Sequence, residues 1–179
     1  MSHTAPATEP GPAADPAPAT TAETSPSVTA PPSMELRKLK LQSSGLIEWS
    51  VFSELVAMDE DEEGFSKSLF QTFVEQVVET FHEIDTNLQA RDLDKLSGLG
   101  HYLKGSAAAL GLETISAQCE RIQNYGNKIN CDEFELKDPA VDQDSDDFWI
   151  AAIEDALAKA RKDFAASKEV LNYYFDDDI

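Results

Sequence analysis

From Ile47 onward, apolar residues recur at intervals of three and four, and no segment alternates apolar and polar residues as a half-buried strand does. This spacing places the apolar side chains on one face of an α-helix. Long amphipathic stretches with short connections between them are typical of up-down helical bundles. The sequence therefore predicts an all-α protein, an antiparallel up-down four-helix bundle with an extra N-terminal lid helix.

The apolar stripes and the residues at their ends delimit the predicted helices. Five stripes are present, at residues 48–58, 69–88, 93–110, 112–129 and 153–171. Asp92 is the expected N-cap of the third helix, and Gly111 is its expected C′ glycine. The acidic run 59–63 ends the first helix, which is the predicted lid. Residues 131–145 are a predicted loop, and the acidic run 176–178 is expected to be a solvated end.

The N-terminal part of the chain has a different composition. Eight of the nine prolines lie in residues 1–33, among Ala, Thr, Ser and Glu. Such a segment buries too little apolar surface to offset the entropy lost on ordering, which predicts disorder. Residues 34–46 are a short, basic, partly apolar connector. We therefore predict a disordered Pro/Ala-rich extension and connector over residues 1–46 and one helical-bundle domain over residues 47–179.

The charge of the chain restricts its partners. Lys and Arg number 14 against 34 Asp and Glu, which gives a formal net charge of -20. This charge disfavours nucleic acid and anionic membrane surfaces, so the expected partner is another protein. No stretch is apolar for long enough to span a bilayer, and the N-terminus lacks a signal-peptide pattern. We expect a soluble monomer, cytoplasmic and nuclear, with reduced Cys119 and Cys131 and with Cys119 buried.

The third predicted helix carries the residues that indicate chemistry. His101 is followed by Lys104 and Gly105, and positions i, i+3 and i+4 share one face of a helix. With Leu103 placed against the core, His101 lies on the opposite side at about 100° per residue. The other residues predicted on the His101 face are small: Ser97, Gly98 and Ala108. The imidazole is thus predicted to be open to solvent, with a cation beside it.

This arrangement suits acceptance of a phosphoryl group. A neutral imidazole is a nucleophile near neutral pH, and Lys104 can offset the charge on the phosphoryl oxygens. Glycine in a helix interior costs about 1 kcal/mol relative to alanine. We interpret Gly98 and Gly105 as leaving an open approach to the ring, and Gly100 as permitting close helix packing. No Ser–His–Asp set, Walker loop or metal-ligand spacing is present, so the phosphoryl donor is predicted to be another protein.

Two segments resemble a known family. His101 to Leu112 (HYLKGSAAALGL) and Cys119 to Asn124 (CERIQN) are similar to histidine-containing phosphotransfer (HPt) proteins, and most of all to the fungal phosphorelay intermediates of the osmosensing pathway. Met58-Asp59-Glu60-Asp61 and Phe65-Ser66-Lys67 add to this resemblance. It covers roughly residues 47–174.

The resemblance implies a phosphorelay and gives roles to particular residues. His101 would take phosphate from the receiver-domain aspartate of a hybrid sensor histidine kinase and pass it to the receiver-domain aspartate of response regulators. The Mg²⁺ ion for this exchange would belong to the receiver, and the chain would have no cofactor and no kinase activity with ATP. Lys104 would support the phosphoryl group, Gly105 would clear space, and Gln123 would hydrogen-bond near the ring. The implied receiver-docking residues are Val51, Leu55, Met58, Phe65, Leu69 and Ser106.

The sequence is compatible with several alternatives. The family often has a basic residue where this chain has Asn127, with Lys128 next, so a second positive charge near the histidine is not assured. Val51, Leu55 and Met58 could instead seat the lid helix on the bundle. A pure adaptor that binds receivers without carrying phosphate is a second hypothesis. A metalloenzyme in a helical bundle is a third, but it needs converging His and Glu-x-x-His ligands, which this sequence does not offer.

Overall fold

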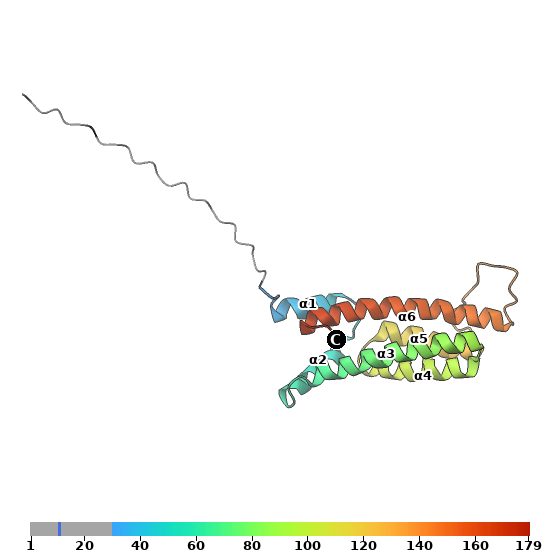
Figure 1. Cartoon of the computed structure of the whole chain (residues 1–179), viewed down its shortest axis with the longest axis horizontal. Helices are drawn as coiled ribbons and strands as arrows, with labels where there is room; N and C mark the ends of the chain where they lie inside the picture. The colour runs from blue at the N-terminus through green and yellow to red at the C-terminus, as the bar shows by residue number, and fades with distance from the viewer. Residues whose placement is uncertain (1–10, 12–29) are drawn as a thin grey trace, which may run out of the picture. The chain divides into compact units, whose positions relative to one another are not determined.

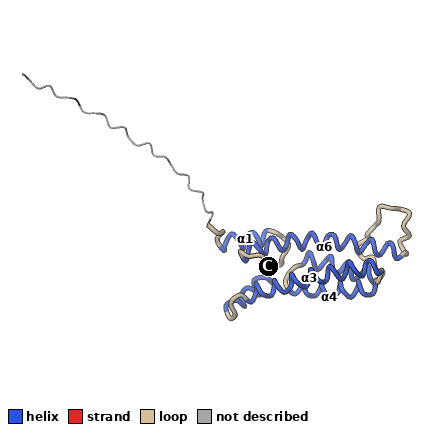
Figure 2. Tube along the Cα trace, in the orientation of Figure 1, coloured by secondary structure: helices blue, strands red, loops and turns tan. Residues whose placement is uncertain are grey.

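The computed structural model describes Gly11 and residues 30–179. The disorder predicted for residues 1–33 therefore falls almost entirely outside the described residues. Within them the regular structure is helical, as predicted (Figures 1 and 2). The elements are α1 (Met34–Ser43), α2 (Trp49–Ala57), the 3-10 turn η1 (Met58–Glu60), α3 (Phe65–Ala90), α4 (Leu93–Ala109), α5 (Glu113–Gly126) and α6 (Asp146–Phe175).

Helices α3, α4, α5 and α6 lie alongside one another and form the four-helix bundle (Figure 1). The predicted stripes supply its core, and their buried members include Phe73, Val77, Phe81, Ile84, Leu96, Leu103, Ile115, Cys119, Ile122, Ile153 and Leu157. The expected caps of α4 are also present. The Asp92 side chain accepts a hydrogen bond from the Lys95 backbone N–H at 3.1 Å, and Gly111 has a φ of +77° just beyond the helix.

The lid helix α2 packs at one end of the bundle through Phe52. This ring is fully buried, 5.5 Å from the ring of Phe70 and edge-on to Tyr174 at 4.9 Å between centroids. The lid also contacts the α4–α5 turn, where the Glu48 N–H donates to the Gly111 carbonyl at 2.7 Å. A Cβ at Gly111 would lie 3.1 Å from the Glu48 carbonyl oxygen, so both φ and space favour glycine there.

The structure places the start of the compact domain earlier than predicted. Residues from Pro31 onward belong to one compact unit, so the boundary predicted at residues 46 and 47 is too late. The connector is mostly helix α1, which packs along the C-terminal part of α6 (Figure 1). Leu41 is fully buried, the Arg37 guanidinium donates to the Tyr174 carbonyl, and the Lys40 ammonium lies 4.1 Å from the Tyr173 ring centroid. Because α1 is held by one buried leucine and by polar contacts, its sequence shows little of the apolar periodicity that would predict a helix.

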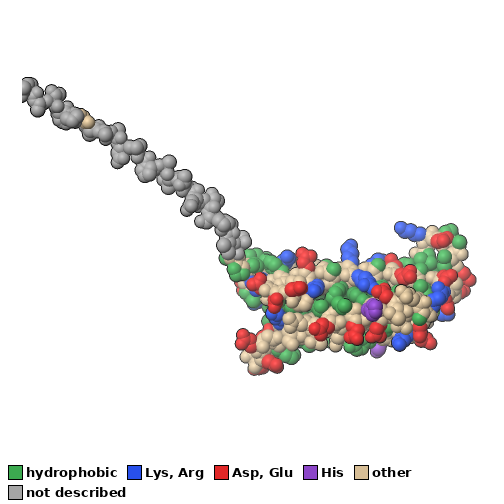
Figure 3. All heavy atoms as spheres, in the orientation of Figure 1, with side chains coloured by type: hydrophobic (Ala, Val, Ile, Leu, Met, Phe, Trp, Pro, Cys, Tyr) green, Lys and Arg blue, Asp and Glu red, His purple; other side chains and the backbone are tan. Residues whose placement is uncertain are grey.

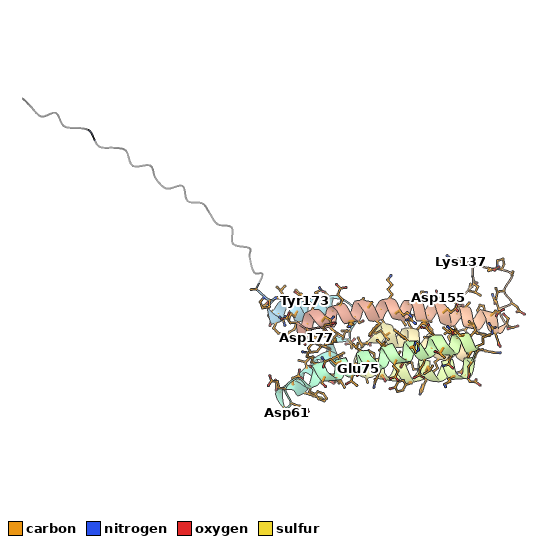
Figure 4. The ribbon with its side chains drawn as sticks, viewed as in Figure 1. Asp61, Glu75, Lys137, Asp155, Tyr173 and Asp177 are labelled. Carbon is orange, nitrogen blue, oxygen red and sulfur yellow. The ribbon has the colours of Figure 1, made fainter. Side chains whose placement is uncertain are left out.

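The acidic end of the chain is exposed, as expected, and it also joins three helices. Asp176 pairs with Arg37 of α1 at 3.2 Å, and Asp177 pairs with Lys67 of α3. Asp178 pairs with Lys168 of α6 at 3.3 Å. Figure 4 shows Asp177 and Tyr173 together at this end of the molecule. Surface ion pairs contribute little individually, so we assign them an orienting role for the chain end.

A polar network links α5 to α6 and to the loop between them. Arg121 contacts Asp132 of the α5–α6 loop at 2.7 Å and Asp155 of α6 at 2.9 Å. The buried Tyr125 hydroxyl also donates to Asp132. Burial, and then the hydrogen bond with Asp132, raise the pKa of Tyr125. Partial burial acts to raise the pKa of Asp132, but hydrogen bonds from Tyr125 and Arg121 outweigh it and lower that pKa.

Helix α5 ends earlier than its predicted stripe. Lys128 adopts a left-handed backbone conformation with φ of +57°, and the Ile129 N–H donates back to the Asn124 carbonyl. This reversal ends the helix at Gly126 and leaves Ile129 47% exposed, although it was predicted on the core stripe.

The cysteines are as predicted, with Cys119 buried. Cys119 and Cys131 are both free, and burial raises the pKa of the Cys119 thiol to about 12. Acidic side chains are spread along the helical part, with Lys and Arg among them (Figure 3). Over residues 30–179, none of the helices is both long enough and apolar enough to cross a membrane.

Candidate functional site

His101 lies midway along α4 with its side chain exposed, while Leu103 is fully buried. The prediction that the two residues occupy opposite sides of the helix is therefore confirmed. A Cβ built at Gly98 or at Gly105 would meet no atom within 4 Å, so both glycines border open space. An incoming group can reach the imidazole without displacing protein atoms at either glycine.

Lys104 is half-buried on the side of α4 that faces α5. Its ammonium lies 3.6 Å from the Glu120 carboxylate of α5. Its backbone carbonyl accepts a hydrogen bond from the Ser116 hydroxyl at 3.2 Å. The predicted cation one turn from His101 is thus present, and it already has an anionic partner in the protein.

Two glycines bring α4 and α5 together beside the histidine. A Cβ at Gly100 would lie 2.7 Å from the Gln123 backbone nitrogen and 2.8 Å from the Cys119 carbonyl oxygen. A Cβ at Gly126 would lie 2.7 Å from the Leu93 carbonyl oxygen. Real Cβ atoms do not approach backbone atoms this closely. The interpretation of Gly100 as a close-packing residue is confirmed.

This close contact corrects one expectation about the His101 face. Ser97 was predicted to share the exposed face, but it is only 8% exposed. It packs against Gly126, and its hydroxyl donates to the Gln123 carbonyl at 3.0 Å. The reason is the short distance between the helices, which covers this edge of α4 with α5.

Gln123 lies on α5 next to Gly100, the residue that precedes His101. Its side-chain oxygen is buried and has no hydrogen-bond partner among the described residues. A buried acceptor without a partner is uncommon in folded proteins. The predicted hydrogen bond near the ring is not formed in this structure, and the Gln123 side-chain oxygen is left as an unused acceptor on the helix that packs against Gly100.

The predicted docking residues come from four elements. Val51 and Leu55 lie on α2, Met58 on η1, Phe65 and Leu69 on α3, and Ser106 on α4. Met58 is 49% exposed and the other five are half-buried. Leu55 and Leu69 pack against the core with part of their surface, so they support the fold as well as the exposed apolar surface.

A shallow groove of about 200 Å³ joins two of these residues between α3 and α4. Leu69 and Phe73 line it from α3, and Ser106 and Leu110 line it from α4. The Ser106 hydroxyl donates to the Tyr102 carbonyl at 3.3 Å, so its hydrogen does not need an acceptor from another protein. One wall of the groove is therefore α4, the helix that carries His101.

The two residues at the site of the family's basic position point elsewhere. Asn127 is exposed and caps the C-terminus of α5. Lys128 pairs with Asp146 at the start of α6 at 3.0 Å. Its ammonium is therefore directed toward α6, and Lys104 is the cation that the structure places one turn from His101.

Glu120 and Ser116 contact Lys104 from α5, and neither was predicted as a site residue. Both contacts depend on the distance between two helices, which periodicity does not give. The signal that could have found them is the pair of helical glycines, Gly100 and Gly126, because such a pair indicates a close crossing. Among the described residues, no three His, Cys, Asp or Glu side chains are placed to hold a metal ion.

Comparisons with known proteins agree with this geometry. The Hpt domain family model matches residues 68–163, which include α4 and α5. The phosphorelay intermediate protein YPD1 of Candida albicans is 52% identical, over 76% of this chain and 96% of its own length. The protein of the same name from Saccharomyces cerevisiae is 33% identical, over 76% of this chain and 97% of its own length.

Solved structures give the same result. The crystal structure of S. cerevisiae Ypd1 with the receiver domain of its downstream response regulator Ssk1 matches with a TM-score of 0.68 and 33% identity. The match covers 76% of this chain and 98% of that Ypd1 chain. With more than half of the chain matched by the family model, and with relatives above 30% identity over nearly their whole length, the chain belongs to the Hpt domain family of histidine phosphotransfer proteins.

Proposed function

We propose that this chain is a phosphorelay intermediate. His101 takes a phosphoryl group from the receiver-domain aspartate of a hybrid sensor histidine kinase and gives it to the receiver-domain aspartate of response regulators in osmotic and stress signalling. The observation that carries the proposal is the exposed His101, bordered by open space at Gly98 and Gly105, with Lys104 one turn away. Two relatives are named phosphorelay intermediates, and one was crystallised with a receiver domain.

The chemical step needs little machinery from this chain. The lone pair of one imidazole nitrogen of His101 forms the N–P bond while the P–O bond to the receiver aspartate breaks. The carboxylate leaves with the bonding electrons, and the other ring nitrogen keeps its proton. In the onward step, an aspartate of a second receiver attacks the phosphorus and the ring nitrogen leaves. The metal ion that phosphoryl transfer commonly requires is expected on the receiver.

Lys104 and Gln123 have separate proposed tasks. The Lys104 ammonium offsets negative charge on the phosphoryl oxygens. The buried side-chain oxygen of Gln123 accepts a hydrogen bond from the ring N–H of His101, which would satisfy an acceptor that has no other partner among the described residues. Gly105 leaves the space through which the receiver's aspartate approaches.

We also propose that the chain has no kinase activity with ATP and acts as a monomer in the cytoplasm and nucleus. The decisive experiment is incubation with a receiver domain that carries radioactive aspartyl phosphate. Acid-labile, alkali-stable label should move to this chain and then to a second receiver. A receiver complex that forms without transfer of label would leave the adaptor hypothesis in place of the relay. ATP alone should transfer no label.

Lys104→Ala should slow transfer without unfolding the domain. A charge-assisted contact to a developing phosphoryl group contributes a few kcal/mol in favourable cases, and less where solvent reaches the site. Because the Lys104 side chain is 31% exposed, we expect a rate about ten- to thirtyfold lower. Single-turnover transfer from a phosphorylated receiver measures this rate. Equal rates in the two proteins would remove the assigned role, and Lys95→Ala, elsewhere on α4, is the control.

Met58→Glu should weaken receiver binding, because Met58 is the most exposed member of the docking set. We expect a dissociation constant about tenfold higher, a loss of about 1.4 kcal/mol. Val78→Glu is a matched control, since Val78 is also an exposed apolar residue, 57% against 49%, and lies away from the docking set on α3. Calorimetric titration with a receiver domain gives both values. An equal loss for the two variants would mean that charge alone, and not docking at Met58, weakens binding.

A further inference from the structure

Glu120 of α5 is the residue that pairs with the lysine beside His101. Its carboxylate lies 3.6 Å from the Lys104 ammonium, and its side chain is 58% exposed. Ion pairs this exposed contribute little to folding stability. The pair therefore matters more for the charge that Lys104 presents to His101 than for the fold.

We propose that Glu120 is a positioning residue for phosphoryl transfer. Its carboxylate competes with the phosphoryl group for the Lys104 ammonium, and this competition keeps the phosphohistidine ready to donate. The proposal rests on the function proposed above for His101 and Lys104, and it deepens that function. It gives Lys104 two alternative anionic partners, the Glu120 carboxylate in the free protein and the phosphoryl group after transfer.

The helix contact keeps Glu120 within reach of Lys104. Gly100 and Gly126 let the backbones of α4 and α5 meet at distances that any Cβ would block. The Ser116 hydroxyl, one turn before Glu120, donates to the Lys104 carbonyl at 3.2 Å. The Glu120 carboxylate thus comes from a backbone that is fixed next to Lys104, and only its side chain has to move when a phosphoryl group arrives.

The charges determine the direction of the effect. A phosphoryl group on His101 adds nearly two negative charges to a site that already holds the Glu120 carboxylate. Repulsion between them, and the loss of the Glu120–Lys104 pair, raise the free energy of the phosphorylated state relative to the free state. A carrier must release its phosphoryl group as readily as it accepts it. Glu120 therefore shifts the equilibrium between phosphohistidine and receiver aspartyl phosphate toward the receiver.

Glu120→Gln tests this in the full-length chain. Mixed with one phosphorylated receiver domain at low ionic strength, the variant should hold about threefold more phosphohistidine at equilibrium than the wild type. The shift should shrink toward onefold in ~0.5 M salt, because exposed charges are screened. Glu113→Gln is the matched control. It removes the same charge from the same face of α5, about 10 Å away along the helix, and it should shift the equilibrium much less, because it has no contact with Lys104.

The same substitution in a Lys104→Met protein tests whether Glu120 acts through Lys104. In Lys104→Met, Glu120→Gln should change the equilibrium by less than half as much on a logarithmic scale. An equal change there would show that Glu120 does not act through Lys104 and would overturn the proposal. So would no change in the wild-type background, or an equal change for Glu113→Gln. If the wild type itself takes no label, the relay function has failed, and that outcome is distinct from a labelled wild type with an unshifted Glu120→Gln.

Discussion

His101→Gln should abolish acid-labile phosphorylation of this chain. Glutamine keeps a polar side chain of moderate size but has no ring nitrogen that can form an N–P bond. The loss is therefore one of the nucleophile itself, and transfer from a phosphorylated receiver should fall by more than about a thousandfold, to background. Gel separation followed by detection of radioactive label, with and without acid treatment, measures it directly.

The fold should not be affected by this change. His101 is exposed, and surface substitutions usually alter the free energy of unfolding by less than about 0.5 kcal/mol. His82→Gln is the matched control, because His82 is exposed on α3 and has no neighbouring lysine and glycine at the offsets found after His101. It should retain full transfer. Equal labelling of His101→Gln and wild type would place the acceptor elsewhere and remove the basis of the relay function.

The bundle was predictable because each of its helices is marked by patterns within its own segment of the sequence. The stripes of α3 to α6, the Asp92 cap and the C′ glycine at Gly111 are local patterns, and each one is present in the structure except for the last member of the α5 stripe, Ile129. Helix α1 was missed for a physical reason. Its fold is stabilised by one buried leucine, Leu41, and by polar contacts to the end of α6, so no apolar face marks it in the sequence.

The site was predictable only in part. Residues that share one helix could be placed from the sequence, and contacts between helices could not. His101, Lys104 and Gly105 lie on one helix, so their spacing alone places them on one face. Glu120 lies on another helix, and its contact with Lys104 depends on how closely α4 and α5 approach. That distance is set by glycines, whose effect on packing cannot be read from periodicity.

Gly100→Ala should destabilise the protein, although alanine favours helices. The new Cβ would lie 2.7 Å from the Gln123 nitrogen and 2.8 Å from the Cys119 carbonyl oxygen. Both are backbone atoms, so relief requires α5 to move away from α4. Overpacking of this kind costs about 1–3 kcal/mol, against a gain of up to about 1 kcal/mol from helix propensity. We expect a net loss of roughly 1–2 kcal/mol, measured by urea unfolding, together with slower phosphoryl transfer as α5 shifts away from Lys104.

The same substitution five residues later should have the opposite effect. At Gly105 a Cβ meets nothing within 4 Å and the backbone is helical, so Gly105→Ala should raise the free energy of unfolding by about 0.5–1 kcal/mol. A loss of stability at both positions would mean that α4 tolerates no added methyl group. Gly100 could then no longer be assigned to helix packing and Gly105 to access to His101. A gain at Gly105 would show that this glycine costs stability while relieving no contact in the free protein. Its open space is then best explained by what has to approach His101, the aspartate of a receiver domain.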